Sequence, residues 1–232
     1  MKITYNAPFT LTYTFICLVI IILDLTLFAS ETVDGREVAG IITQRYFTVY
    51  PFGTEPMRLS NPLAYFRLIS HTMGHGSWLH FFGNFSLILL IGPILEEKYG
   101  SKKLLYMSLA TALITGLLNA IFFDSGLLGA SGIVFMLILL ASFTNVQRGV
   151  IPLTFILILV IYLGKEIYDA FSNDQISQFA HIIGGICGSI FGYVMGGKKD
   201  NGKSLKTVEE RTQESILPSD TSTSNKDDFM DL

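Results

Sequence analysis

The sequence predicts an all-α membrane protein built as a bundle of six transmembrane helices. The first observation is compositional: the 232 residues are 50% hydrophobic and only 15% charged, with a mean hydropathy of +0.49, whereas soluble domains carry about 25% charged residues. The second is the spacing of the charges, which leaves six uncharged intervals of 16 to 28 residues. The third is that runs such as 153–163 lack the regularly recurring polar face of a soluble amphipathic helix.

Each uncharged interval can hold one membrane-spanning helix, which needs about 20 mostly apolar residues. The fifth interval is the shortest, but Pro152 suits the first turn of a helix there. The first interval is followed by Asp24 and lacks a strongly basic leader, so we expect a span rather than a cleavable signal peptide. The predicted spans are 9–29, 79–95, 103–123, 127–145, 150–166 and 176–196, which together form a membrane domain over 9–196.

The basic residues predict how the chain crosses the membrane. With a cytoplasmic N-terminus, eleven of the 16 Lys and Arg residues lie inside and five lie outside, and Lys and Arg favour the cytoplasmic side. We therefore expect residues 1–8 and 197–232 in the cytoplasm, and the composition of 197–232 is typical of a disordered tail. The short tail and the lack of organelle-targeting features favour the plasma membrane of a bacterium, crossed several times.

The long first loop, 30–78, is expected to be folded and extracellular. It contains an uncharged aromatic-rich run at 46–52, and aromatic side chains favour the membrane–water interface. One interpretation is that this loop dips partly into the outer leaflet. The other is a small extracellular cap with its own core.

Several function classes are excluded at this stage. A net charge of −3 gives no nucleic-acid-binding footprint. Cys17 and Cys187 both lie in apolar runs, so neither a disulfide framework nor a cysteine metal site is predicted. His71 and His75 have the spacing to share a metal ion, but no His-Glu-x-x-His pattern accompanies them. A hydrogen bond that anchors the loop is the preferred interpretation of these two histidines.

The acidic residues near the span ends have structural interpretations. Asp24 is expected near the interface, bonded to a partner helix. Glu96 and Glu97 are expected to be solvated charges on the cytoplasmic side, and Glu166 is expected at the water boundary.

Polar residues inside the spans carry the functional hypothesis, because they are costly in lipid and face the protein interior or a water-filled cavity. His80 and Asn84 are four residues apart and share a helix face. Ser131 lies between two glycines in the fourth span. His181 shares a face with Gly185, Gly188 and Gly192 in the sixth span, which are the small residues that let helices approach closely.

Two such small-residue faces can bring a hydroxyl and an imidazole together. An adjacent His181 can take the proton of the Ser131 hydroxyl, and the amide of Asn84 can donate to an oxyanion. The three side chains therefore have the parts needed for acyl transfer. Ser131 is expected about four residues into its span, roughly 6 Å deep, on the outer side and within reach of water. The alternatives are that Ser131 only bonds its own backbone and that the glycine face of the last span only serves packing.

Four motifs then resemble the signatures of the rhomboid intramembrane serine proteases, in the same order and on the expected spans. Residues 75–84 contain the His-x-x-x-Asn of the second span, and 96–100 are similar to the acidic stretch that ends that span at a glycine. Gly129–Gly132 resembles the Gly-x-Ser-Gly nucleophile motif, and Ala180–Gly185 resembles the Ala-His-x-x-Gly motif of the sixth span. The resemblance covers roughly 60–196, and it implies a rhomboid-like bundle of six helices.

The resemblance implies a role for each site residue. Ser131 would be the nucleophile and His181 its general base, in a dyad without a carboxylate. His80, Asn84 and the backbone N–H of Ser131 would form the oxyanion hole. Arg67 matches the first-loop arginine, although a Phe precedes it where the family has Trp.

The family often has Tyr at the position of Phe135. By spacing alone, the ring of Phe135 shares the helix face of Ser131 and can support the imidazole of His181. Because Phe lacks a phenol, a third catalytic member is not expected here.

The resemblance also implies substrates and partners. Transmembrane proteins would enter from the lipid bilayer, no metal or other cofactor would be needed, and 164–178 would act as a lid. Two alternatives stay open: a catalytically inactive relative that binds transmembrane clients, and a small transporter or channel. The intact Ser131, His181 and Asn84 disfavour the first alternative, and the lack of an inverted repeat disfavours the second.

Overall fold

The computed structural model describes residues 5–27, 32–33, 36–37, 39–146, 153, 156–157, 160–161 and 175–196. The longer helices are α1 (Pro8–Ile22), α4 (Trp78–Tyr99), α5 (Ser101–Phe122), α6 (Ser131–Val146) and α8 (Gln175–Gly196). The shorter elements are a π-helix η1 (Leu23–Leu27), α2 (Ile41–Tyr46), the 3-10 turns η2 (Glu55–Met57) and η3 (His71–Met73), and α3 (Pro62–Ser70). Most of the expected fifth span, the expected lid up to its last residues, and the tail 197–232 lie outside the described residues.

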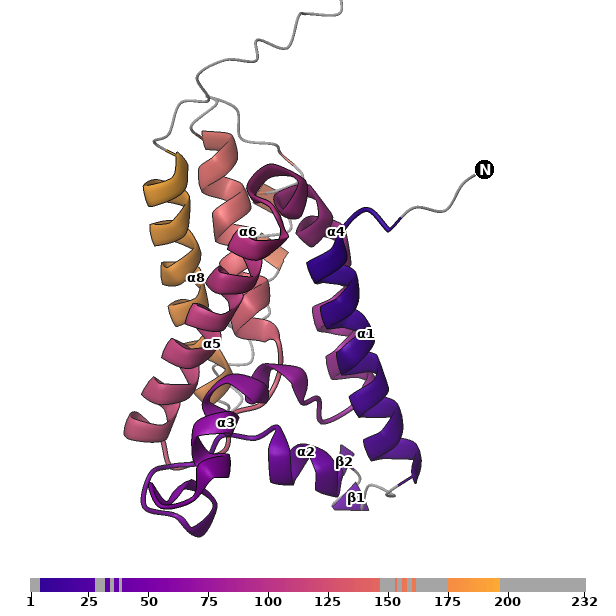
Figure 1. Ribbon diagram of the computed structural model, residues 1–232, viewed down its shortest axis with the longest axis vertical. Helices are drawn as coiled ribbons and strands as arrows, with labels where there is room; N and C mark the ends of the chain where they lie inside the picture. The colour runs from indigo at the N-terminus through magenta and orange to yellow at the C-terminus, as the bar shows by residue number, and fades with distance from the viewer. Residues whose placement is uncertain are drawn as a thin grey trace, which may run out of the picture. The chain divides into compact units, whose positions relative to one another are not determined.

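The all-helical membrane class is confirmed. Three helical stretches are long and apolar enough to cross a bilayer, Pro8–Thr26, Trp78–Tyr99 and Ser101–Phe122, and α6 and α8 are apolar over shorter stretches. Within the described residues, regular strands are limited to β1 (Thr32–Val33) and β2 (Arg36–Glu37), one short antiparallel pair. Figure 1 shows the long helices side by side, with α6 beside α8.

The side chain of Glu96 fixes the start of α1 and corrects one prediction. Its two carboxylate oxygens accept hydrogen bonds from the backbone N–H of Phe9 (2.6 Å) and of Thr10 (2.9 Å), and a third comes from the Thr10 hydroxyl (2.8 Å). These are the unpaired donors of a helix N-terminus, where a negative charge is favourable. Glu96 is therefore buried and is not a solvated charge. Helix α4 continues past the predicted end at residue 95 to Tyr99.

Asp24, which follows the last residue of α1 closely, likewise accepts hydrogen bonds from the N-terminus of a helix, in this case α2. Its carboxylate is fully buried and accepts hydrogen bonds from the backbone N–H of Ile42 (2.8 Å) and Thr43 (3.1 Å). These are donors in the first turn of α2, which begins after Gly40 without a side-chain cap of its own. The expectation that Asp24 bonds to a partner helix is thus confirmed, and the partner is a helix of the first loop.

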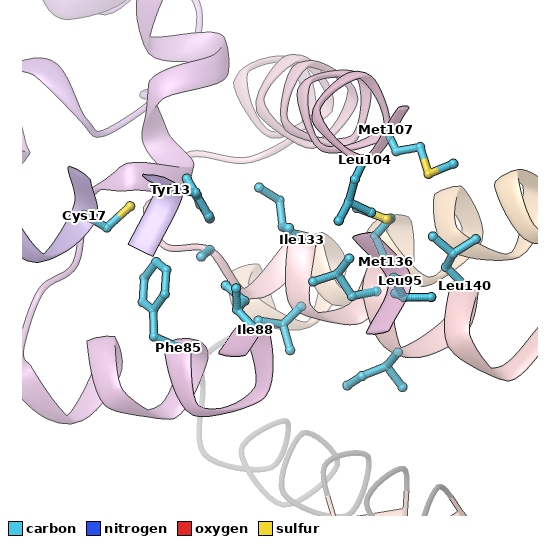
Figure 2. Packing of buried hydrophobic residues seen from close by; sticks show 14 of the residues in the cluster. Tyr13, Cys17, Phe85, Ile88, Leu95, Leu104, Met107, Ile133, Met136 and Leu140 are labelled. Atoms are coloured by element: carbon cyan, nitrogen blue, oxygen red, sulfur yellow. The ribbon is translucent and has the colours of Figure 1, made fainter. Parts of the chain in front are cut away.

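Aliphatic and aromatic side chains from α1, α4, α5, α6 and α8 form the main core. Figure 2 shows Tyr13 and Cys17 of α1 close to Phe85 of α4, with Ile133 and Met136 of α6 further along the same cluster. Helix α6 is the most enclosed element, because nearly every described side chain along it is buried. A helix buried on all sides needs no polar face, which explains the uniformly apolar sequence that follows Ser131.

The first loop folds around α3. The buried guanidinium of Arg67 donates to the carbonyl oxygens of Arg45 and Pro56, and the hydroxyl of Ser70 donates to the carbonyl of Tyr46 at 2.6 Å. The carbonyls of irregular backbone thus find donors inside the protein, as buried carbonyl groups require.

Candidate active site

The candidate site lies at the start of α6. This helix begins at Ser131, four residues after the predicted start at residue 127. Val49 and Leu127 exchange two backbone hydrogen bonds, N to O at 3.0 and 2.9 Å, as an antiparallel bridge. The chain therefore runs extended through Leu127 and turns at Gly129, whose φ is +114°. Ser131 is the first residue of α6 and is partly exposed. The predicted position of Ser131, four residues into its helix, was wrong, because a contact with the first loop holds Leu127 in a bridge.

Two glycines of α8 bring that helix against the backbone of α6. A Cβ added to Gly184 would collide with the backbone of Gly132, and one added to Gly188 would collide with the backbone of Met136. The pairs 132 with 184 and 136 with 188 advance in the same direction, so the two helices run parallel.

The glycine face differs in one detail from the prediction. Gly188 is at the contact as expected, but Gly184 takes the place assigned to Gly185. A Cβ on Gly185 would meet only the side chain of Leu139, at 3.6 Å, which is an ordinary contact. The step from His181 to Gly184 is three residues and the step from Gly184 to Gly188 is four, so these residues also share one face of a helix.

His181 lies against the first turns of α6. Its imidazole is buried and stacks on the ring of Phe135, with centroids 4.5 Å apart and planes at 9°. Phe135 is one helical turn beyond Ser131, so the two residues share one face of α6. His181, the predicted base, therefore contacts the same face of α6 that begins with Ser131, the predicted nucleophile. The expected contact between Phe135 and His181 is thus present.

His80 and Asn84 meet the turn that precedes Ser131. From the position that a Cβ on Gly129 would occupy, His80 Nε2 is 2.6 Å away and Asn84 Nδ2 is 3.9 Å away. A side chain at position 129 is therefore excluded twice, by the positive φ and by the histidine ring. Asn84 is buried, and within the described part of the chain its Nδ2 finds no hydrogen-bond acceptor. A buried donor without an acceptor is unusual and has the chemistry of an oxyanion ligand.

Comparison with known proteins identifies the family of this chain. The model of the rhomboid domain family matches residues 62–198, more than half of the chain. The chain belongs to the rhomboid family. Among its relatives is a protein named rhomboid protease GlpG from Haemophilus influenzae, 28% identical over 131 residues, which cover 55% of this chain and 68% of that protein. The protein of the same name from Yersinia pestis is 25% identical over 206 residues, covering 87% and 66% of the two chains.

A plant relative shows how widely the domain occurs. RHOMBOID-like protein 4 of Arabidopsis thaliana is 29% identical over 137 residues, which cover 56% of this chain but 34% of that protein. The chain thus spans about two thirds of the bacterial relatives and about one third of the plant relative. The family and the apolar helices make this rhomboid a membrane protein.

His71 ties the first loop of this rhomboid to both the site and α5. Its carbonyl accepts the backbone N–H of Gly129 at 2.9 Å. Its imidazole lies with Nδ1 3.3 Å from the carbonyl of Arg67 and with Nε2 3.4 Å from the hydroxyl of Thr115. Burial lowers the pKa of His71 to about 4, so the ring is neutral at ordinary pH. The preferred interpretation, a loop-anchoring hydrogen bond, is confirmed for this histidine.

Three buried polar residues of α5 were missed by the sequence analysis. Thr111, Thr115 and Asn119 recur every four residues on one face of an otherwise apolar span. The rule that singled out Ser131, that polar groups in a span face the interior, applies equally to them. Within the described residues, no group of three or more His, Cys, Asp or Glu side chains could hold a metal ion.

Proposed function

We propose that this chain is an active intramembrane serine protease that hydrolyses peptide bonds in or near the transmembrane segments of other membrane proteins. Ser131 is the nucleophile and His181 is the general base, in a dyad without a carboxylate. The observation that supports this most directly is the stacking of His181 on Phe135, one helical turn from Ser131. Relatives named rhomboid protease support the same reaction class.

The proposed reaction proceeds in two halves. The Ser131 hydroxyl attacks the scissile carbonyl carbon while His181 accepts its proton. The tetrahedral intermediate collapses to an acyl-enzyme, and the leaving amine takes the proton back from His181. A water molecule then attacks the ester, with His181 again as the base, and releases the carboxylate product and the free Ser131 hydroxyl.

The oxyanion of each intermediate is proposed to bind His80, Asn84 and the backbone N–H of Ser131. The unpaired Nδ2 of Asn84 supports this assignment, because it is a donor held in place before any substrate arrives. The position of Ser131 supports it too, since the backbone N–H of the first residue of α6 has no partner within its own helix. One such donor is typically worth about 10²–10³ in rate.

The substrate class follows from the surroundings of the site. Ser131 is partly exposed at the end of α6 that contacts the first loop, so water can reach it without crossing the apolar core. A transmembrane substrate must unwind locally, because the peptide bonds of a helix are shielded by their own hydrogen bonds. Glycine and other helix-destabilising residues near the cleavage site are therefore expected to speed cleavage.

The proposed setting is the plasma membrane of a bacterium, with 1–8 and 197–232 in the cytoplasm and the loop 30–78 outside. The basic residues support this orientation. Reporter fusions test it: phosphatase fused after residue 232 should be inactive, and phosphatase inserted after Gly53, at an exposed turn of the loop, should be active. The reverse pattern would refute the orientation.

The central experiment compares two serine variants in liposomes that contain a generic transmembrane reporter. Ser131→Ala should abolish cleavage, whereas Ser142→Ala, a matched change further along α6, should cleave like the wild type. A fluorophosphonate probe should label the wild type, and His181→Ala should lose this labelling. Continued cleavage by Ser131→Ala would refute the nucleophile, and a folded wild type that neither cleaves nor labels would favour an inactive, client-binding relative.

A further inference from the structure

A buried histidine outside the proposed machinery lies beside His80. His75 precedes α4, and its side chain has no exposed surface. Its Nδ1 is 3.3 Å from the carbonyl oxygen of Met73, and because a carbonyl only accepts, Nδ1 carries the hydrogen. Burial lowers the pKa of His75 to about 3, so its ring stays neutral and keeps this hydrogen-bonding pattern at ordinary pH.

Aromatic rings of α4 surround the imidazole of His75. Its centroid is 5.5 Å from that of Phe81, nearly perpendicular to it at 80°, and 5.5 Å from that of Phe85. The bond to Met73 and these two phenyl rings leave the His75 ring little freedom to rotate. Both phenyl rings belong to the buried core, so the position of His75 is tied to the packing of the bundle.

A third ring in contact with His75 is that of His80. The two imidazoles make an edge contact, with centroids 5.1 Å apart and planes at 62°. His80 also places Nε2 and Cε1 within 2.7 Å of the position that a Cβ on Gly129 would occupy. The His80 ring is thus held between a fixed ring and the turn that leads to Ser131.

We propose that His75 is a positioning residue for His80, whose ring it holds against Gly129 in the orientation that a donor to the oxyanion requires. This inference rests on the proposed function. Misplacing a group at a reacting centre by about 1 Å can cost about 10²-fold in rate, so loss of this support has a measurable effect. The effect acts on the transition state rather than on the bound substrate, because the negative charge on the oxygen develops only as the tetrahedral intermediate forms.

The kinetic test uses the reconstituted protein and a cleavable transmembrane reporter. His75→Ala should lower kcat by about 10- to 100-fold and leave KM within about two-fold, since the loss cannot exceed the ~10²–10³ of a whole oxyanion donor. His75→Phe keeps a ring edge at the same place and should recover most of kcat. In a His80→Ala background, the change of His75 to Ala should have no further effect on kcat, because the two residues act as a unit. Full additivity of the two losses would overturn the proposal.

A second readout does not depend on activity. The chain has four histidines, so a protein labelled with nitrogen-15 histidine gives few imidazole signals, and the His80 signal is the one missing from His80→Ala. His75→Ala should shift the His80 signal, whereas His71→Ala, which removes a buried imidazole from the same loop, should leave it in place. An unshifted His80 signal in His75→Ala overturns the proposal even if the wild type does not cleave.

Thermal unfolding of each variant identifies those that fail to fold. If His75→Ala unfolds, His75→Leu replaces it, because Leu fills the space without providing a ring. Its expected results are the same: a lower kcat, a shifted His80 signal and no additional loss in the His80→Ala background.

Discussion

The ring of Phe135 lies flat on the imidazole of His181, with centroids 4.5 Å apart and planes at 9°. This stack joins α6, which begins at Ser131, to α8. Phe135 has no group that exchanges protons, so its effect on the proposed base is geometric: it restricts rotation of the imidazole.

Removing this ring should slow the reaction of Ser131. Phe135→Ala should lower the rate of fluorophosphonate labelling by about 10-fold, because the base then samples unproductive orientations. Phe135→Tyr keeps the stack and should label within about two-fold of the wild type. The labelling rate is measured per folded molecule, since truncating a buried Phe costs about 3–5 kcal/mol of stability.

Leu137→Ala is the control for a nonspecific effect of a cavity in the same helix. It truncates another buried side chain of α6, and it should label at the wild-type rate once the folded fraction is taken into account. If it slows labelling as much as Phe135→Ala does, the stack has no special role.

The close contact between α6 and α8 gives a stability prediction. Gly184→Ala and Gly188→Ala should each lower the free energy of unfolding by about 1–3 kcal/mol, because the new methyl group meets backbone of α6 that cannot move aside. Gly185→Ala is the matched control and should be nearly neutral, since its methyl group would meet only the Leu139 side chain at 3.6 Å. Thermal unfolding in detergent measures all three, and equal losses at 184 and 185 would contradict the contact.

Charge spacing and helical periodicity correctly predicted the features of the fold that depend on local sequence. The all-helical membrane class follows from where the charges are absent, and the shared face of His80 and Asn84 follows from their spacing of four. Contacts between residues far apart in sequence could not be predicted in the same way. The bridge between Val49 and Leu127 keeps the chain extended before α6, and nothing in the local sequence of either residue indicates this pairing.

Glu96 shows the same limit for a single side chain. Its position beside Glu97, Lys98 and a glycine is typical of a solvated end of a helix. Only the tertiary structure brings the N-terminus of α1 to its carboxylate, where three donors replace water. A charge can be buried when such donors compensate it, and sequence reasoning had no means to locate them.

Separate replacement of Glu96 and Glu97 by Gln tests whether only the buried glutamate stabilises the fold. Glu96→Gln should lower the free energy of unfolding by about 1.5–3 kcal/mol, the range for hydrogen bonds to a charged group, because an amide offers one acceptor oxygen and a competing donor. Glu97→Gln changes an exposed side chain and should have little effect. Thermal unfolding measures both, and equal sensitivity of the two positions would show that the bonds to Phe9 and Thr10 contribute no net stability.

The two buried histidines of the first loop predict how stability depends on pH. Burial lowers the pKa of His71 to about 4 and that of His75 to about 3, below the value of about 6.5 in an unfolded chain. Between these values the unfolded state binds more protons, so stability rises with pH. The contribution is complete above pH 6.5 and is lost as the pH falls toward 4. For His71 the loss approaches roughly 3 kcal/mol at still lower pH, at about 1.4 kcal/mol per pKa unit.

Unfolding in detergent between pH 4 and pH 8 measures this dependence, and substitution separates it from the titration of carboxylates. His71→Asn keeps a side-chain donor for the Arg67 carbonyl but cannot take up a proton. It should be less stable than the wild type at pH 8, because the shorter side chain loses the contact with the Thr115 hydroxyl. The two stabilities should converge as the pH falls, because only the wild type is then destabilised by protonation of a buried imidazole. Parallel curves for the two proteins would mean that His71 binds protons equally in the folded and unfolded states, contrary to its burial between α3 and α5.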